Sequence, residues 1–153
     1  MTNVFSMFIP CTPKAVQSDR SFSAGKKIIH YQPAKVVDWK AFIRISVLNK
    51  LDKDWEPLDG PVDVVLAHLF LPRKTEKKAV LKLIEEGMWV YKTTRPDKDN
   101  LGKGFYDACS GLLWKDDAQV AHSDEIKAYA KVEGVFICVK NLPQSIPAYI
   151  NIS

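Results

Sequence analysis

The stretch from Pro61 to Leu71, PVDVVLAHLFL, constrains the fold more than any other part of the chain. It is rich in β-branched and apolar residues, an Asp-Gly-Pro turn over residues 59–61 leads into it, and Pro72 ends it. Such a run is typical of a buried strand. We therefore expect a domain with a β-sheet in its core.

Other segments supply the remaining secondary structure. Apolar runs predict further strands, the last two of them an antiparallel pair joined at Glu133-Gly134, over residues 4–9, 120–131 and 135–140. Helical spacing of apolar residues predicts helices over residues 33–50, 75–86 and 99–110. Residues 14–32 are polar and without a clear period, so we expect a loop that faces a ligand. The sum is an α+β (mixed α/β) fold, a mixed sheet of about four strands packed with about three helices.

The composition indicates one soluble domain. The 153 residues fit a single compact domain, which typically has roughly 100–150 residues. Three cysteines without paired spacing indicate neither a zinc site nor a disulfide framework, and hence a reducing compartment. No stretch resembles a signal peptide or approaches the roughly 20 apolar residues of a membrane span. We expect a cytoplasmic protein with one domain over residues 1–153 and no membrane contact.

The net charge of +4 is compatible with a polyanionic partner and equally with an ordinary soluble surface. Basic residues gather in one segment and just before an acidic cluster, at Arg73, Lys74, Lys77, Lys78, Lys92 and Arg95. On charge alone this grouping is more typical of a solvated helix face. The alternative is a surface that follows DNA phosphates beside a metal site.

The residues from Arg95 to Val120 carry the chemistry. Two acidic pairs stand on either side of the helix expected over residues 99–110, namely Asp97 with Asp99 and Asp116 with Asp117. An extended residue between the members of the first pair would make both carboxylates point the same way. Helical spacing then places three residues on one face: Asp99, Lys103 and Asp107. A tight return after Gly111 would bring the second pair within reach of the first.

Clustered carboxylates with no adjacent His or Cys select a hard cation such as Mg²⁺, which would activate a water and neutralise charge on a phosphate. Lys103 would contact the scissile phosphate. Each residue also has an ordinary structural interpretation. Asp97 or Asp99 would be a helix cap, Lys103 a partner in surface ion pairs, and Asp116-Asp117 a turn. Spacing alone leaves both interpretations open.

The combined pattern D-x-D-N-L-x-K, a helix with an Asp, and W-x-D-D-A-Q-V resembles the signature of RusA-type Holliday-junction resolvases. The residues that carry the resemblance are Asp97, Asp99, Asn100, Leu101, Lys103, Asp107, Trp114, Asp116, Asp117, Gln119 and Val120. The N-terminal strand and the last two strands fit the family layout more loosely. Residues 72–94 look like a basic insertion relative to shorter members, and we expect this insertion to contact DNA.

The resemblance implies a homodimeric, Mg²⁺-dependent endonuclease that nicks opposed strands of a four-way DNA junction in recombination, replication or repair. Mn²⁺ is an expected substitute, and no organic cofactor is expected. The implied metal-binding catalytic carboxylates and essential lysine are Asp97, Asp99, Asp117 and Lys103. The implied auxiliary groups are Asp116, Asn100 and Asp107. Family members are often encoded by phages or prophages, and a junction with two-fold symmetry suits a two-fold dimer.

Two other functions are compatible with the same residues. One is another metal-dependent nuclease or phosphotransferase that uses the same carboxylates. The other is a non-catalytic DNA-binding module that keeps the basic residues and does not need the acidic ones. The histidines do not change this picture, since His68 is expected to be a core histidine and His122 to lie on a strand surface.

Overall fold

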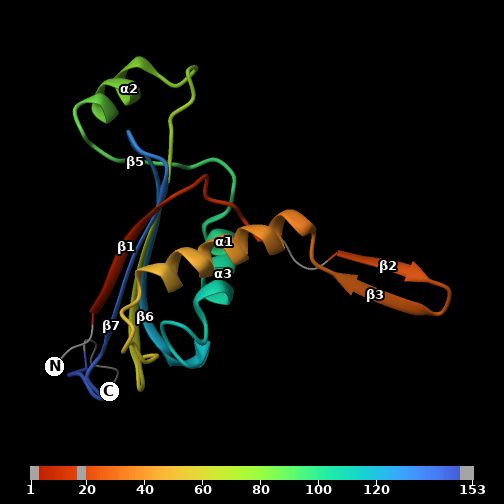
Figure 1. The fold of residues 1–153 in the computed structure, drawn as a ribbon. Coiled ribbons are helices and arrows are strands. Elements are labelled where there is room, and N and C mark those ends of the chain that lie inside the picture. Colours follow the sequence, from red (N-terminus) through yellow and green to blue (C-terminus); the bar gives the residue numbers. More distant parts are fainter. Residues whose placement is uncertain (1–3, 17–19, 149–153) are drawn as a thin grey trace.

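The computed structural model describes residues 4–16 and 20–148. Within these ranges the chain forms a five-stranded mixed sheet, a separate two-stranded hairpin and three α-helices (Figure 1). This arrangement confirms the α+β fold. The sheet has one strand more than the expected four, because the short strand β5 adds an edge.

The strands of the sheet, in the order in which they pair, are β1 (Val4–Pro10), β7 (Gly134–Asn141), β4 (Val62–Phe70), β6 (Val120–Tyr129) and β5 (Val90–Tyr91). β4 is the central strand, parallel to β6 and antiparallel to β7. β1 is antiparallel to β7, and β5 is antiparallel to β6. The apolar run from Pro61 to Leu71 thus forms a strand buried on both faces, as predicted.

The remaining elements are β2 (Arg20–Ala24), β3 (Lys27–Tyr31), α1 (Ala34–Lys50), α2 (Lys78–Glu85), α3 (Lys98–Cys109) and a 3₁₀ helix, η1 (Asp117–Gln119). The expected helices over residues 33–50 and 99–110 are confirmed within a residue or two. The helix expected over 75–86 is shorter, because it begins only at Lys78. Gly87 follows its end with a φ of 89°, a conformation that favours glycine.

Two predictions about the strands are wrong. The strands near the C-terminus do not form a hairpin, because β4 lies between β6 and β7 and pairs with both. The burial of β4 explains this, because its buried backbone N–H and C=O groups need hydrogen-bond partners on both edges of the strand. Residues 14–32 do not form only a loop: β2 and β3 pair as a hairpin over residues 20–31, while residues 17–19 lie outside the described residues. The side chains of β2 and β3 are exposed, so the sequence of these strands shows no periodic pattern of buried residues.

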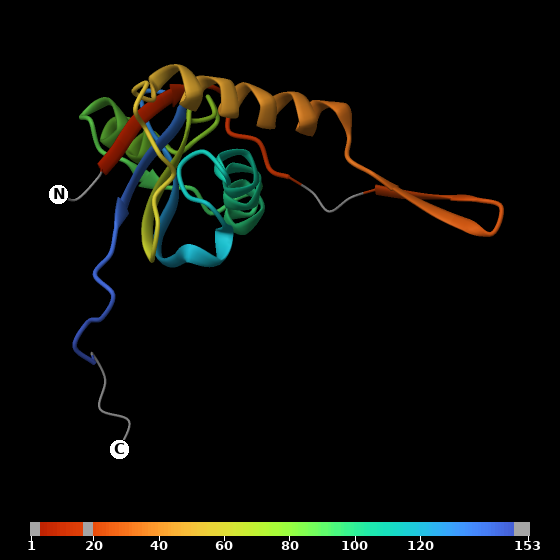
Figure 2. The same cartoon turned by 60° about the horizontal axis from the view of Figure 1, so that its bottom comes forward.

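Helices α1 and α3 pack against each other and contribute to one core with one face of the sheet (Figures 1 and 2). α1 buries Trp39, Ile43 and Val47 at helical spacing, and α3 buries Leu101 and Phe105. Inward residues of β4 and β7 complete this core. α3 is thereby fixed over β6, which is the geometry that forms the candidate site. No helix in the described part of the chain is long and apolar enough to cross a membrane.

Candidate active site

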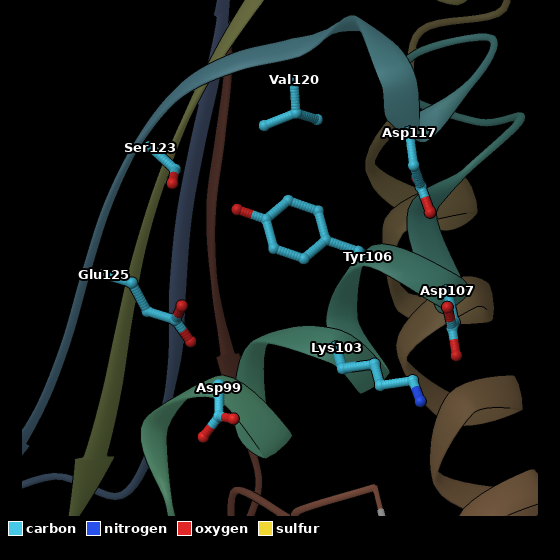
Figure 3. A pocket seen from close by; sticks show the side chains of 8 residues that line it. All are labelled: Asp99, Lys103, Tyr106, Asp107, Asp117, Val120, Ser123 and Glu125. Atoms are coloured by element: carbon cyan, nitrogen blue, oxygen red, sulfur yellow. The ribbon is translucent and has the colours of Figure 1, made fainter. Parts of the chain in front are cut away.

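A pocket between α3 and β6 brings together residues that are far apart in the sequence (Figure 3). It is lined by Asp99, Lys103, Tyr106 and Asp107 of α3, Asp117 of η1, and Val120, Ser123 and Glu125 of β6. The second acidic stretch therefore returns to the first, as the sequence suggested, through Asp99 and Asp117. Asp99, Lys103 and Asp107 share one helix face, also as predicted.

Asp97 lies outside this pocket. It is the N-cap residue of α3, with a φ of −72° and a ψ of 140°, and its side chain makes no capping hydrogen bond. An extended Lys98, the condition under which both carboxylates would point the same way, is not met, because α3 already begins at Lys98 and nearby helical positions diverge around the axis. Asp97 lines a neighbouring pocket, which is formed with Ala15, Arg95, Pro96 and Asn100.

Two lysines fix the loop that leads to Asp97. The Lys92 ammonium donates hydrogen bonds to the carbonyl and hydroxyl oxygens of Thr94 and to the Arg95 carbonyl oxygen. Lys127 of β6 donates to the carbonyl oxygens of Thr94 and Pro96, at 2.8 and 2.7 Å. Lys92 also lies over the rings of Phe70 and Tyr129. Burial lowers the pKa of Lys92, and the nearby Lys127 lowers it further.

We expected Lys92 to face DNA, but it is buried, with only 7% of its surface exposed. Its charge is used inside the chain, where it orders the loop. The other expected DNA-binding residues are exposed: Arg73, Lys74, Lys77, Lys78 and Arg95. The first four lie in or next to the start of α2, beyond the β5 end of the sheet, whereas Arg95 lies beside Asp97 (Figure 1).

The motif W-x-D-D-A-Q builds the turn that presents Asp117. The buried Trp114 indole donates a hydrogen bond from Nε1 to Asp117 Oδ1, at 2.7 Å. Asp116 caps η1 by accepting from the Ala118 amide at 2.7 Å, and Gln119 completes the capping box. The turn interpretation therefore describes Asp116, which lines neither pocket. Asp117 is the member of the pair that faces the site.

Glu125 is a site residue that the sequence interpretation missed. Its carboxylate lies against Gly102 of α3, where an added β-carbon would be 2.5 Å from Oε1, and it is 2.8 Å from Nε2 of the buried His68. In Figure 3 the Tyr106 ring lies between Glu125 and Asp117. A signal was present, since Ser123, Glu125 and Lys127 place polar groups at alternate positions of one strand. His68 is a core histidine as expected, although its Nδ1 has no partner among the described residues.

A sequence profile for the family described as endodeoxyribonuclease RusA matches residues 10–140. The chain belongs to this family. A relative, the uncharacterized protein YqaN of Bacillus subtilis (strain 168), is 26% identical over 131 residues, which cover 85% of this chain and 91% of that protein. The family match confirms the resemblance seen in the motifs and extends it to most of the chain, including both acidic stretches.

Polar groups complete the pocket of this RusA-family chain. Asp107 pairs with Lys40 of α1, with 2.8 Å between Oδ2 and Nζ, so the helix–helix contact uses its charge. Lys103 is exposed, and no carboxylate of the described residues pairs with it.

Burial raises the pKa of Tyr106 above its usual value. A hydrogen bond with Ser123 lowers this pKa, and the charge of Glu125 raises it further. The phenol therefore remains protonated at neutral pH and able to donate.

The pocket of this RusA-family chain has the right donor chemistry for a hard cation. Its carboxylates are Asp99, Asp107, Asp117 and Glu125, and its other polar groups are hydroxyls and Lys103. Within the described residues, no three His, Cys, Asp or Glu side chains are arranged as a metal-binding group. Mg²⁺ does not require one, since it keeps several waters and takes one or two carboxylates together with substrate phosphate.

Proposed function

We propose that this RusA-family chain is a Mg²⁺-dependent endonuclease that nicks opposed strands of four-way DNA junctions. The observation that supports it best is the shared pocket of Asp99 and Asp117, which come from separate stretches and lie with the cationic Lys103 in a chain of an endodeoxyribonuclease family. The setting would be the branched DNA of recombination, replication or repair.

The acidic residues have different roles in this proposal. Asp99 and Asp117 would hold the cation, and Asp97 would join them from the neighbouring pocket when DNA spans both. Bound Mg²⁺ supplies an activated water and neutralises charge on the phosphate. Glu125 is the fourth carboxylate that we assign to the site, since it lies against Gly102 of α3 and lines the same pocket as Asp99.

The remaining polar groups orient the reaction. Lys103 lines the pocket and forms no ion pair with the described residues, so its ammonium group would contact the scissile phosphate, where charge develops. Trp114 donates a hydrogen bond to Oδ1 of Asp117, and no other side chain of the described residues donates to this carboxylate, which lines the pocket. The protonated Tyr106 would donate a hydrogen bond to a phosphate or water oxygen that enters the pocket.

A homodimer is part of this proposal. One chain offers one such pocket, whereas a junction is resolved by two nicks related by a two-fold axis. Sedimentation of the free protein and of its junction complex measures the stoichiometry directly. A single chain per junction at concentrations that support cutting would contradict the dimer.

The central test is nicking of a synthetic four-way junction in Mg²⁺, in Mn²⁺ and in EDTA. Asp117→Asn is the informative variant, because it keeps the shape and the acceptor for Trp114 and removes only the charge. We expect loss of cutting with retained junction binding. Asp124→Asn is the matched control, an exposed acid of β6 one residue from Glu125 and outside the pocket.

Four results would overturn the proposal. Cutting that persists in EDTA would exclude a requirement for a divalent metal ion. Cutting by Asp117→Asn at the wild-type rate would exclude this pocket as the active site. Flap or linear DNA cut as well as the junction would indicate a different metal-dependent nuclease. Binding without cutting in any divalent cation would indicate a non-catalytic DNA-binding module.

A further inference from the structure

The hairpin of β2 and β3, residues 20–31, projects from the body at the start of α1 (Figures 1 and 2). We call it the arm. All residues of both strands are exposed, and Gly25, with a φ of 64°, opens a two-residue turn of the kind that joins tight hairpins. An isolated two-stranded hairpin is marginally stable in water. Four large apolar side chains nevertheless stay 42–68% exposed on it, which indicates a surface made for a partner: Phe22, Ile28, Ile29 and Tyr31.

The strand register sorts the side chains of the arm onto two faces. One face carries the pairs Arg20 with Tyr31, Phe22 with Ile29, and Ala24 with Lys27. The rings of Phe22 and Tyr31 form an edge-to-face pair there, with centroids 6.0 Å apart. The other face carries Ser21 with His30 and Ser23 with Ile28. The first face is therefore an aromatic and aliphatic patch with a cation at each end.

Within residues 20–37, which lie between Asp19 and Asp38, the charge has one sign. Residues 20–37 contain four basic residues and no Asp or Glu, namely Arg20, Lys26, Lys27 and Lys35. Such a segment attracts a polyanion and repels the same segment of a second copy. Aromatic groups beside cations are the combination that binds unstacked bases together with their phosphates.

The described segments on either side of the arm are connected to α3, the helix that carries the candidate site, through Val16 before it and Gln32 after it. On the incoming side, the Val16 amide donates to the Asn100 carbonyl oxygen at 2.9 Å, and Val16 packs where a β-carbon on Gly104 would lie. On the outgoing side, Lys40 donates to Gln32 Oε1 at 3.2 Å and pairs with Asp107 at 2.8 Å. The chain thus contacts α3 at Val16 before the arm and, through Lys40, at Gln32 after it, beside residues that line the two pockets.

We propose that the arm is a DNA-binding element that contacts the branch point beside the cutting site. Its cations bind backbone phosphates, and the patch of Phe22, Ile29 and Tyr31 packs against bases that are unstacked where the strands exchange. The inference rests on the proposed function for its substrate, and it adds a binding surface separate from the pocket and from the basic segment at α2.

The test measures binding in Ca²⁺, without cutting, for a four-way junction and for a duplex of the same arm sequence. Lys26→Glu with Lys27→Glu is expected to lower the salt slope of junction binding by about 2, because each phosphate contact contributes about 0.9. Lys53→Glu with Lys131→Glu is the matched control, with exposed lysines outside the arm. Phe22→Ala with Tyr31→Ala is expected to weaken junction binding about tenfold or more and duplex binding much less.

The outcomes separate this inference from the proposed function. Arm variants that bind the junction with wild-type affinity and salt slope would overturn the proposal that the arm binds DNA, even if the wild-type protein cuts junctions. Arm variants that lose junction preference support it, even if the wild-type protein proves to be a binding module without cutting. Conversion of a wild-type dimer into a monomer by Phe22→Ala with Tyr31→Ala, with DNA binding per chain unchanged, would assign the patch to a second copy and overturn the proposal. Circular dichroism of each variant is the control for correct folding.

Discussion

Gly102→Ala in α3 tests whether Glu125 belongs to the active site, because the substitution acts on Glu125 without altering it. A β-carbon on Gly102 would lie 2.5 Å from Oε1 and 2.7 Å from Oε2 of that carboxylate, whereas ordinary contacts begin at 3.4 Å. The carboxylate would therefore have to retreat by about 1 Å, since packed interiors leave no room for overlap. The retreat would also disturb its 2.8 Å contact with His68.

The substitution is expected to change activity much more than stability. Alanine is favoured over glycine by about 1 kcal/mol within a helix, so the substitution itself favours the folded state and offsets part of the disturbed contact. A displacement of about 1 Å at a reacting group can lower the rate about 100-fold. We therefore expect a protein of nearly unchanged stability in urea unfolding whose single-turnover nicking of a four-way junction in Mg²⁺ is about 100-fold slower.

A double-mutant cycle with Glu125→Gln makes the test specific. If Gly102→Ala acts through the carboxylate, it should cost little further activity once the charge is gone. The reasoning would be refuted by wild-type cutting in Gly102→Ala, or by the same loss of activity in both backgrounds. The second result would mean that α3 itself had moved.

Two further predictions concern charges outside the pocket. Lys92→Met should lower the free energy of unfolding in urea by about 1–3 kcal/mol, because it removes the buried ammonium that donates to partly buried oxygens of Thr94 and Arg95; Lys131→Met, at an exposed position, should leave it unchanged. The hydrogen bond to Asp63 raises the pKa of His122 above 6.5. The protonated form is thus stabilised by folding, and its contribution is full below pH 6.5 and lost as the pH rises through the folded pKa. NMR titration should show a raised His122 pKa that falls towards 6.5 in Asp63→Asn, and equal values in the two proteins would exclude this pair as the cause.

The sequence predicted the parts of the fold that depend on local patterns. The central strand, α1 and α3 were recognisable because burial imposes a period of two or of 3.6 residues. The order of the strands was not, since pairing of β4 with both β6 and β7 depends on contacts between distant segments. The strands of the arm have no such signal for a related reason, because exposed strands carry no burial pattern.

The candidate site divides in the same way. Asp99, Lys103 and Asp107 follow from helical spacing, and the motif indicated Asp117. Glu125 depends on which face of β6 meets α3, and this is decided by the sheet. Lys92 illustrates the limit of reading charge from sequence, because a lysine among other basic residues can serve the protein's own backbone oxygens.

The parallel pairing of β4 with β6 requires a long connection between them. That connection carries α2, β5, α3 and η1, and thus Asp97, Asp99, Lys103 and Asp117 together. Its two ends are held by adjacent strands, so a change in the length of its first part, before Lys92, leaves the later part in place. The α2 segment is therefore a place where the chain can change in length and surface charge without moving the residues of the candidate site.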